Sequence, residues 1–199
     1  MKMTYIIIGI ILVGGLVFYL TSCSNNSTSN DKQTNTAQDT AKVKPTKESA
    51  FEGLRDMAFS VTPEQLGLSL PYDKAIVYGV VMDWEMGGAT ATIVSYQTGD
   101  ASLYVSSGGG VLGGGQHKSV SNAAKQFVSL AQTFLVKSTE TENILLPVTD
   151  EVKFYLLTNK GVFLGVETIK NLENNSSLWL KLFEEGNNVL TELRKTSEK

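Results

Sequence analysis

The chain has 199 residues, with 17 basic and 20 acidic side chains and a formal net charge of −3. Nucleic-acid-binding proteins carry a basic surface, so this balance argues against that class, and no nucleic-acid partner is expected. One cysteine and one histidine exclude an internal disulfide and leave too few ligands for the usual zinc sites. We therefore expect no metal, no cofactor and a fold that depends on its own apolar core.

The N-terminal leader is short and apolar. Residues 6–20 form a run of fifteen uncharged residues after the single basic residue Lys2. A membrane-spanning helix needs about 20 apolar residues, whereas the core of a secretion signal needs about 7–15. The run ends in Leu20-Thr21-Ser22-Cys23, which resembles the lipobox of bacterial lipoproteins.

The lipobox resemblance implies how the mature protein is attached. In that family the signal peptide, here residues 1–22, is removed, and the thiol of the new N-terminal cysteine, here Cys23, carries a diacylglyceryl group. Two or more acyl chains, palmitate among them, make membrane attachment stable. The resemblance therefore implies a lipidated Cys23 and a location in the bacterial cell envelope. An uncleaved, short membrane helix is the alternative, and it leaves residues 24–199 on the same side of the membrane.

A polar segment follows the cysteine. Residues 24–47 contain almost no large apolar side chain and cannot bury enough surface to offset the entropy lost on ordering. We therefore expect residues 23–47 to comprise the lipidated cysteine and a disordered polar linker. A flexible coil of 24 residues has a typical end-to-end distance of about 27 Å, which would keep the domain near the bilayer.

Residues 48–199 are expected to form a single globular domain. Its first half begins with a weak helical period and then changes to segments rich in β-branched and aromatic residues. Gly87-Gly88 separates two of these segments and predicts a hairpin. In chain order, we expect a helix over 48–59, a turn capped by Thr62 with Pro63 after it, and strands over 75–84, 89–96 and 101–106.

The second half contains the most regular apolar stripe, at helical spacing, from Val120 to Leu135. Ser119 or Ser121 would cap this helix. Gly186 interrupts the stripe of the last helix, either through close packing or as a break. The pattern predicts a helix from Ser119 or Ser121 onward, strands over 151–158 and 162–169, and a helix over 177–195.

The element order α-βββ-α-ββ-α predicts an α+β domain with a five-stranded, mainly antiparallel sheet covered by helices, because tight turns pair strands antiparallel. The layout resembles small mixed domains such as profilin, roadblock and longin-like folds. Their element order differs, so no residue roles are transferred from them. Residues 98–104, followed by the glycine run 108–115, also resemble a motif of uncharacterised bacterial proteins, to which no activity is attached.

The glycine-rich loop is the first candidate site. Six of the eight residues from Gly108 to Gly115 are glycine, and each costs up to about 1 kcal/mol of ordering relative to alanine. Either a backbone nest binds an anion or a partner's carboxylate there, or the segment is a tight, mobile crossover with positive φ angles. The G-x-G-x-x-G match argues weakly for a dinucleotide, since its last glycine is separated from the helix and the strands are antiparallel. We expect a recognition loop made of Gly108, Gly109, Gly110, Gly113, Gly114, Gly115, Gln116, His117 and Lys118.

His117 is the only histidine. A serine hydrolase would need it beside a nucleophile and a carboxylate. No G-x-S-x-G elbow is present, and a lone loop histidine is usually solvated, so we expect no catalytic residue. The nearest candidates along the chain are Ser106, Ser107, Asp83 and Asp100.

Asp83, Trp84 and Glu85 form an acidic and aromatic cluster. The two carboxylates share one face of a predicted strand, with Cβ atoms about 6.6 Å apart, and such a pair beside a tryptophan suits glycosidic chemistry. Solvated carboxylates at a hairpin end beside a packing tryptophan are more common, and we expect that arrangement.

These features predict a noncatalytic, lipid-anchored envelope protein whose domain binds a protein or another envelope partner. The N-terminal lipid would attach it to the membrane. The alternatives are a weak envelope hydrolase that uses His117 and a lipoprotein that binds a small ligand in a pocket between sheet and helix.

Overall fold

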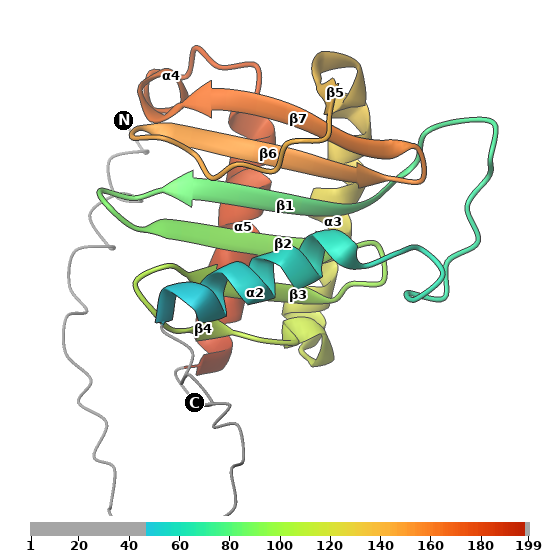
Figure 1. Ribbon diagram of the computed structural model, residues 1–199, viewed down its shortest axis with the longest axis horizontal. Helices are drawn as coiled ribbons and strands as arrows, with labels where there is room; N and C mark the ends of the chain where they lie inside the picture. The colour runs from blue at the N-terminus through green and yellow to red at the C-terminus, as the bar shows by residue number, and fades with distance from the viewer. Residues whose placement is uncertain (1–46, 198–199) are drawn as a thin grey trace, which may run out of the picture. The chain divides into compact units, whose positions relative to one another are not determined.

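Seven strands form one sheet in the computed structural model, which describes residues 47–197 (Figure 1). The predicted signal peptide, Cys23 and the linker up to residue 46 lie outside the described residues. The strand order is β4-β3-β2-β1-β6-β7-β5, and each neighbouring pair is antiparallel. The strands are β1 (Val77–Glu85), β2 (Thr90–Tyr96), β3 (Ala101–Val105), β4 (Gly110–Val111), β5 (Thr139–Thr141), β6 (Glu151–Thr158) and β7 (Gly161–Thr168).

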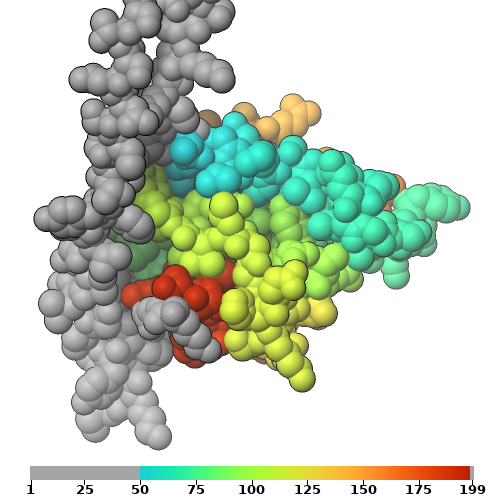
Figure 2. Space-filling model, turned by 90° about the horizontal axis from the view of Figure 1, so that it is seen from below, coloured from blue at the N-terminus to red at the C-terminus, as the bar shows by residue number. Residues whose placement is uncertain are grey.

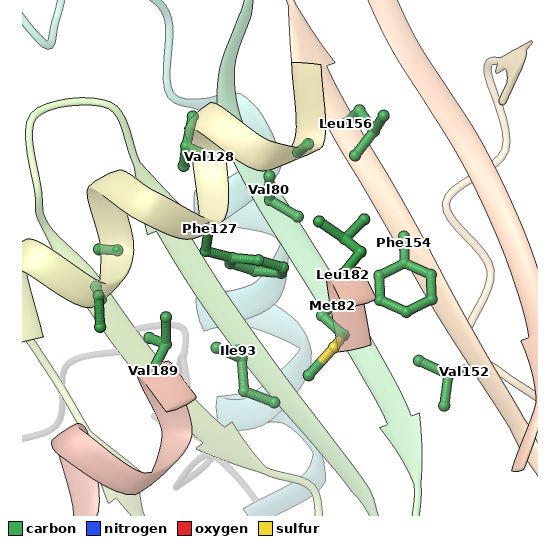
Figure 3. Close-up of a cluster of buried hydrophobic side chains, with 14 of the residues drawn as sticks. Val80, Met82, Ile93, Phe127, Val128, Val152, Phe154, Leu156, Leu182 and Val189 are labelled. Atoms are coloured by element: carbon green, nitrogen blue, oxygen red, sulfur yellow. The ribbon is translucent and has the colours of Figure 1, made fainter. Parts of the chain in front are cut away.

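Two long helices, α3 (Lys118–Ala131) and α5 (Leu180–Ser197), cover one face of the sheet (Figure 1). Phe127 of α3, Leu182 of α5 and Met82 of β1 meet in the centre of this layer and are fully buried (Figure 3). Burial of each such side chain contributes about 1.5–3 kcal/mol to folding. The main core therefore lies between the sheet and these two helices.

The opposite face carries α2 (Lys47–Ser60), which crosses the sheet on the side toward the viewer in Figure 1. Phe51 and Ala58 of α2 are buried in a second apolar cluster with side chains of the sheet. The Tyr96 hydroxyl donates a hydrogen bond of 2.8 Å to the Ala58 carbonyl oxygen. Because the central strands are covered on both faces, β1 and β2 are apolar at most positions and do not alternate between buried and exposed residues.

The α+β class and the antiparallel pairing are confirmed, and all five predicted strands are present with ends within two residues of those expected. The predicted strand number and element order are wrong, because the sheet has seven strands and two short strands were missed. These are β4, inside the glycine run, and β5, in a polar segment; strands of two or three residues give no apolar period. A short helix, α4 (Ile169–Glu173), was also not expected between β7 and α5.

The start of α3 differs from the prediction as well. The N-cap residue is His117, not Ser119 or Ser121, and its side chain makes no capping hydrogen bond. The 3₁₀ helix η1 (Gly114–Gln116) leads directly into α3, and the Ser121 N–H already bonds to the His117 carbonyl oxygen at 2.9 Å. The helical ladder therefore begins before either serine can cap it. After Ala131 the chain continues as a second 3₁₀ helix, η2 (Gln132–Lys137).

Gly186 lies within α5, which runs without a break from Leu180 to Ser197. A Cβ atom at this position would lie 2.6 Å from the sulfur of Met82 and 3.3 Å from the Phe127 ring. Close packing against the core, and not a helix break, explains this glycine.

Candidate functional site

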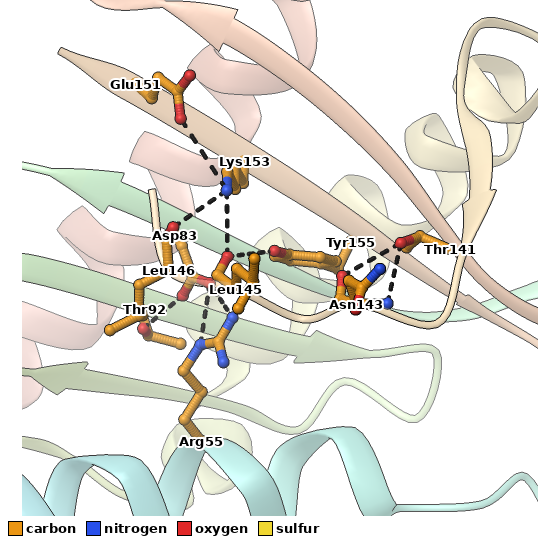
Figure 4. Close-up of polar contacts among 10 residues, drawn as sticks. All are labelled: Arg55, Asp83, Thr92, Thr141, Asn143, Leu145, Leu146, Glu151, Lys153 and Tyr155. Carbon is orange, nitrogen blue, oxygen red and sulfur yellow. Dashed lines mark hydrogen bonds and ion pairs between the residues drawn. The ribbon is translucent and has the colours of Figure 1, made fainter. Parts of the chain in front are cut away.

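A row of polar side chains crosses the α2 face of the sheet. In the strand register, Asp83 of β1 lies opposite Thr92 of β2 on one side and Lys153 of β6 on the other. Directly opposite residues of antiparallel strands point to the same face, so the three side chains lie next to one another. Arg55 extends from α2 toward them across this face of the sheet (Figure 4). We call Arg55, Asp83, Thr92 and Lys153 the Asp83 cluster.

Asp83 is fully buried and its carboxylate is bonded on both oxygens. Arg55 donates to Oδ2 from Nε at 3.0 Å and from Nη2 at 2.7 Å, and the Thr92 hydroxyl donates to Oδ1. The guanidinium carbon of Arg55 also lies 4.8 Å from the ring centroid of Phe59 and 5.6 Å from that of Tyr155. Such partners are what a buried ion pair needs to offset its loss of hydration.

The electrostatics of Asp83 are those of a structural group. Burial raises the pKa of its carboxyl group above the ordinary value, and the bonds from Arg55 and Thr92 and the charge of Lys153 offset this only in part. Arg55 of α2 and Thr92 of β2 bind the carboxylate directly, and Lys153 of β6 contributes through its charge. The cluster therefore fixes α2 on the sheet, and we assign it no role in catalysis.

The structure separates the acidic pair predicted at the end of β1. Because Asp83 is buried beneath α2, the expectation that both carboxylates are solvated is wrong for Asp83. Glu85 accepts hydrogen bonds from the N–H groups of Gly88 and Asp150, which lower its pKa. Trp84 points to the α3 and α5 face, where its ring meets Phe183 edge-on at 5.1 Å. The two carboxylates do not face a common substrate position, as glycosidic hydrolysis requires.

The glycine-rich loop connects β3 to α3 and contains β4 and η1. Gly108, Gly109, Gly110 and Gly113 have φ angles of 108°, 90°, 152° and 65°, a region that other residues rarely adopt. At Gly110 a Cβ atom would also lie 2.2 Å from the Leu103 carbonyl oxygen. The turn and the pairing of β4 with β3 therefore require glycine at these positions.

Gly114 and Gly115 are explained by close packing. A Cβ atom would lie 2.3 Å from the Leu193 side chain at Gly114, and 2.5 Å from a carboxylate oxygen of Asp100 at Gly115. The 3₁₀ helix η1 thus lies directly on α5 and on the turn between β2 and β3. Positive φ angles therefore account for four of the six glycines and close packing for the other two, and none of them needs a bound anion to justify it.

The side chains of the same loop are exposed. Leu112 is 63% exposed, and Gln116, His117 and Lys118 lie at the surface at the start of α3. Figure 2 shows this yellow-green part of the chain at the surface between α2, in blue, and α5, in red. The polar residues at the end of the predicted recognition loop and the apolar Leu112 are therefore all accessible to a partner.

The structure does not assemble a catalytic triad from the candidates near His117. Asp83 lies beneath α2, whereas His117 begins α3 on the other face of the sheet. The Ser106 hydroxyl oxygen accepts a hydrogen bond from the Thr90 N–H at 2.8 Å, and Asp100 accepts one from the Thr98 hydroxyl at 2.8 Å. Ser107 is exposed in the β3–β4 turn. These residues serve the turns in which they lie.

An open pocket of about 330 Å³ lies at the other edge of the sheet, between β5, β7 and the residue before α5. Trp179 forms one wall, and its ring stacks on Phe154 with an interplanar angle of 11°. Lys137 and Glu140 bring one charge of each sign to the rim. Among residues 47–197, no group of three or more His, Cys, Asp or Glu side chains is placed to hold a metal ion.

Neither the partner of Asp83 nor the pocket at Trp179 is predicted from the sequence. Arg55 is 28 positions from Asp83 along the chain, and no local pattern joins a helical arginine to a strand aspartate. The one available signal was an acidic residue inside an apolar strand, because a charge that deep requires a partner.

Within the part of the chain that the structure covers, no helix is long and apolar enough to span a bilayer. No protein-family model matches this chain, and no curated protein or solved structure matches it either.

Proposed function

We propose that the chain is a lipid-anchored protein of a bacterial cell envelope, whose domain binds a protein or another envelope partner without catalysing a reaction. The apolar leader that ends in Leu20-Thr21-Ser22-Cys23 supports the anchor. Residues 108–118 form the recognition loop of this proposal.

The observation that carries the proposal is a loop whose backbone is fixed while its side chains are exposed. The positive φ angles of the glycines and the packing of Gly114 on α5 hold the main chain. Leu112 and His117 project from it to solvent. A preformed loop loses little conformational entropy on binding, and an apolar residue with polar neighbours suits the centre and rim of an interface.

Photo-crosslinking in the native envelope tests the recognition loop. We expect Leu112→Asp to weaken capture of the partner by about 2 kcal/mol, because it would bury an unpaired charge in the proposed interface. Val136→Asp is the matched control, because Val136 is an apolar residue 90% exposed in η2, away from the loop. Equal capture by wild type and Leu112→Asp would refute the recognition loop.

The anchor is tested separately with Cys23→Ser. We expect the mature wild-type chain to enter the detergent-rich phase and to carry the mass of a diacylglyceryl group, and the variant to do neither. An unchanged mass and an unchanged partition of the variant would contradict the anchor and leave the recognition loop to be judged by crosslinking.

Small-ligand binding is a second candidate, and the pocket at Trp179 is the observation that favours it. Trp179 is the aromatic side chain of the pocket lining and is backed by the buried Phe154 ring, and Lys137 and Glu140 place charges at the rim that suit a polar ligand. A change in tryptophan fluorescence on ligand addition that persists in Trp84→Phe but disappears in Trp179→Phe would assign the ligand to this pocket.

A further inference from the structure

The segment between β5 and β6, residues 142–150, exposes three apolar side chains in a stretch of four residues. Leu145 is 69% exposed, and Leu146 and Val148 are exposed with it, while Pro147 between them is buried. We call residues 142–150 the apolar loop. Single exposed apolar residues are common on protein surfaces, but a contiguous group marks a contact with another apolar phase.

The apolar loop is held in this conformation by bonds to its backbone. Lys153 Nζ donates to the carbonyl oxygens of Leu145 at 3.3 Å and Leu146 at 3.0 Å, and the Tyr155 hydroxyl donates to that of Leu145 (Figure 4). At the end of the loop, the Asp150 N–H donates to Glu85 at 3.1 Å. The carbonyl groups therefore face the sheet, and the leucine side chains are left in solvent.

The apolar loop and α2 lie on the same face of the sheet, toward the viewer in Figure 1. The chain enters the domain through α2, whose first residue is Lys47. Cys23 is only 24 residues before that point. A coil of that length spans about 27 Å, so an anchored domain would keep the α2 face within reach of the bilayer.

We propose that the apolar loop inserts into the interfacial region of the bilayer that holds the anchor, so that the α2 face is turned toward lipid. This rests on the proposed lipid anchor at Cys23. The composition of the loop fits lipid better than a protein partner, because protein hot spots are rich in Trp, Tyr and Arg, and the exposed residues here are Leu and Val. The opposite face, with α3 and α5, then points away from the bilayer.

The charges around the apolar loop specify the lipid. Glu142 and Asp150 are exposed within it, and Glu52 and Asp56 are exposed on α2. The ammonium of Lys153 is turned inward to the carbonyl oxygens. Acidic groups are repelled by anionic headgroups, so the loop fits a zwitterionic surface better than an anionic one.

Site-specific fluorescence on the full lipidated chain tests this orientation. An environment-sensitive probe is attached at Leu145→Cys, and in a matched variant at Val136→Cys, which is even more exposed but lies in η2. Both chains are reconstituted in phosphatidylcholine vesicles that contain a lipid-borne nitroxide quencher. We expect quenching at position 145 to exceed that at 136 by at least about twofold, and to decrease when phosphatidylglycerol is added.

Each result has a defined meaning. Equal quenching at the two positions, with the chain still sedimenting with the vesicles, overturns insertion of the loop and leaves the anchor intact. A chain that does not sediment, and whose Cys23 thiol reacts with the probe, overturns the anchor and the loop proposal together. A position 145 that is shielded in the native envelope but not quenched in vesicles assigns the loop to a protein and also contradicts the proposal.

Discussion

Asp83 shows what a single charge inside the sheet requires. An ionised carboxylate in a protein interior is unstable unless it is paired and hydrogen-bonded, and here α2 and β2 supply bonded partners while Lys153 of β6 adds a nearby positive charge. Arg55 links the charge to α2, and its guanidinium packs against Phe59 and Tyr155. The pair is therefore the polar attachment of α2 to a face that is otherwise apolar.

We expect Asp83→Ala to lower the free energy of unfolding by about 3–5 kcal/mol, because it leaves the Arg55 charge buried without a partner. Urea denaturation measures the change. Asp56→Ala, at the exposed neighbour of Arg55, is the matched control and should alter stability by less than about 0.5 kcal/mol. The double variant Arg55→Met, Asp83→Leu should recover most of the loss. A single Asp83→Ala loss no larger than that of the control would contradict this account.

Alanine substitutions at two glycines should change the stability of the domain in opposite directions. A Cβ atom at Gly165 of β7 would lie 2.0 Å from the Trp179 ring, which is held between Phe134 and Phe154. We therefore expect Gly165→Ala to destabilise the domain by about 1–3 kcal/mol through overpacking. A Cβ atom at Gly53 of α2 would have no neighbouring atom within 4 Å, so Gly53→Ala should stabilise the domain by about 0.5–1 kcal/mol. Thermal unfolding of the two variants under one condition compares the signs, and a stabilising Gly165→Ala would refute the packing argument.

At the scale of elements, the sequence predicts the helices and strands that have a periodic apolar pattern or are joined by a tight turn. The hairpins β1–β2 and β6–β7 were found because β-branched and aromatic runs are separated by glycine-containing turns. The stripe of α3 was found because one of its faces is buried from Val120 to Ala131.

What the sequence could not give depends on contacts between distant elements. β5 pairs with β7, although the paired residues Thr139 and Leu164 are far apart in the chain, and its polar sequence has no strand signal. The predicted start of α3 is wrong because the 3₁₀ helix η1 leads directly into it, so that the helical hydrogen bonds begin before either serine can cap them. Composition alone identifies the glycine-rich loop as a candidate site. It does not reveal which contacts and backbone angles require glycine at each position.

Glu167 connects β7, α4 and the segment before α5, and it makes that junction sensitive to pH. Burial raises its pKa, but hydrogen bonds from Ser177, Thr168 and Asn171 outweigh burial and lower the pKa below its ordinary value of 4.5. A carboxylate with a lowered pKa contributes stability that is present above pH 4.5 and lost as the pH falls through its folded value. We therefore expect Glu167→Gln to unfold with a weaker pH dependence than wild type between about pH 5 and 3.

Denaturant unfolding as a function of pH measures this difference. Glu173→Gln is the matched control, because Glu173 is an exposed carboxylate on α4. The control should follow the wild-type curve, since within residues 47–197 the Glu173 carboxylate has none of the hydrogen bonds that Glu167 accepts. Parallel curves for wild type and Glu167→Gln would show that the junction does not depend on the charge.

At the scale of the whole molecule, the sheet has two covers of unequal size. α3 and α5 form a continuous layer on one face, whereas the other face depends on α2 and on loops that pack beside it. Tyr78, Tyr96 and Tyr155 on that second face each donate a hydroxyl hydrogen bond to a backbone carbonyl of these covering segments. The helix that follows the predicted linker is therefore part of the fold, and a boundary between linker and domain cannot fall after it.

We expect a chain of residues 45–199 to be monomeric and to unfold cooperatively, and a chain of residues 61–199 to aggregate, because loss of α2 uncovers the apolar side chains of the second face.

Phe51→Ala in the longer chain should lower its stability by about 3–5 kcal/mol, since Phe51 is buried. Met57→Ala, on the exposed side of α2, should change it little. Size-exclusion chromatography and urea denaturation measure both effects. If the shorter chain remains monomeric and as stable as the longer one, α2 belongs to the linker, and the Arg55–Asp83 pair cannot be what holds the second face closed.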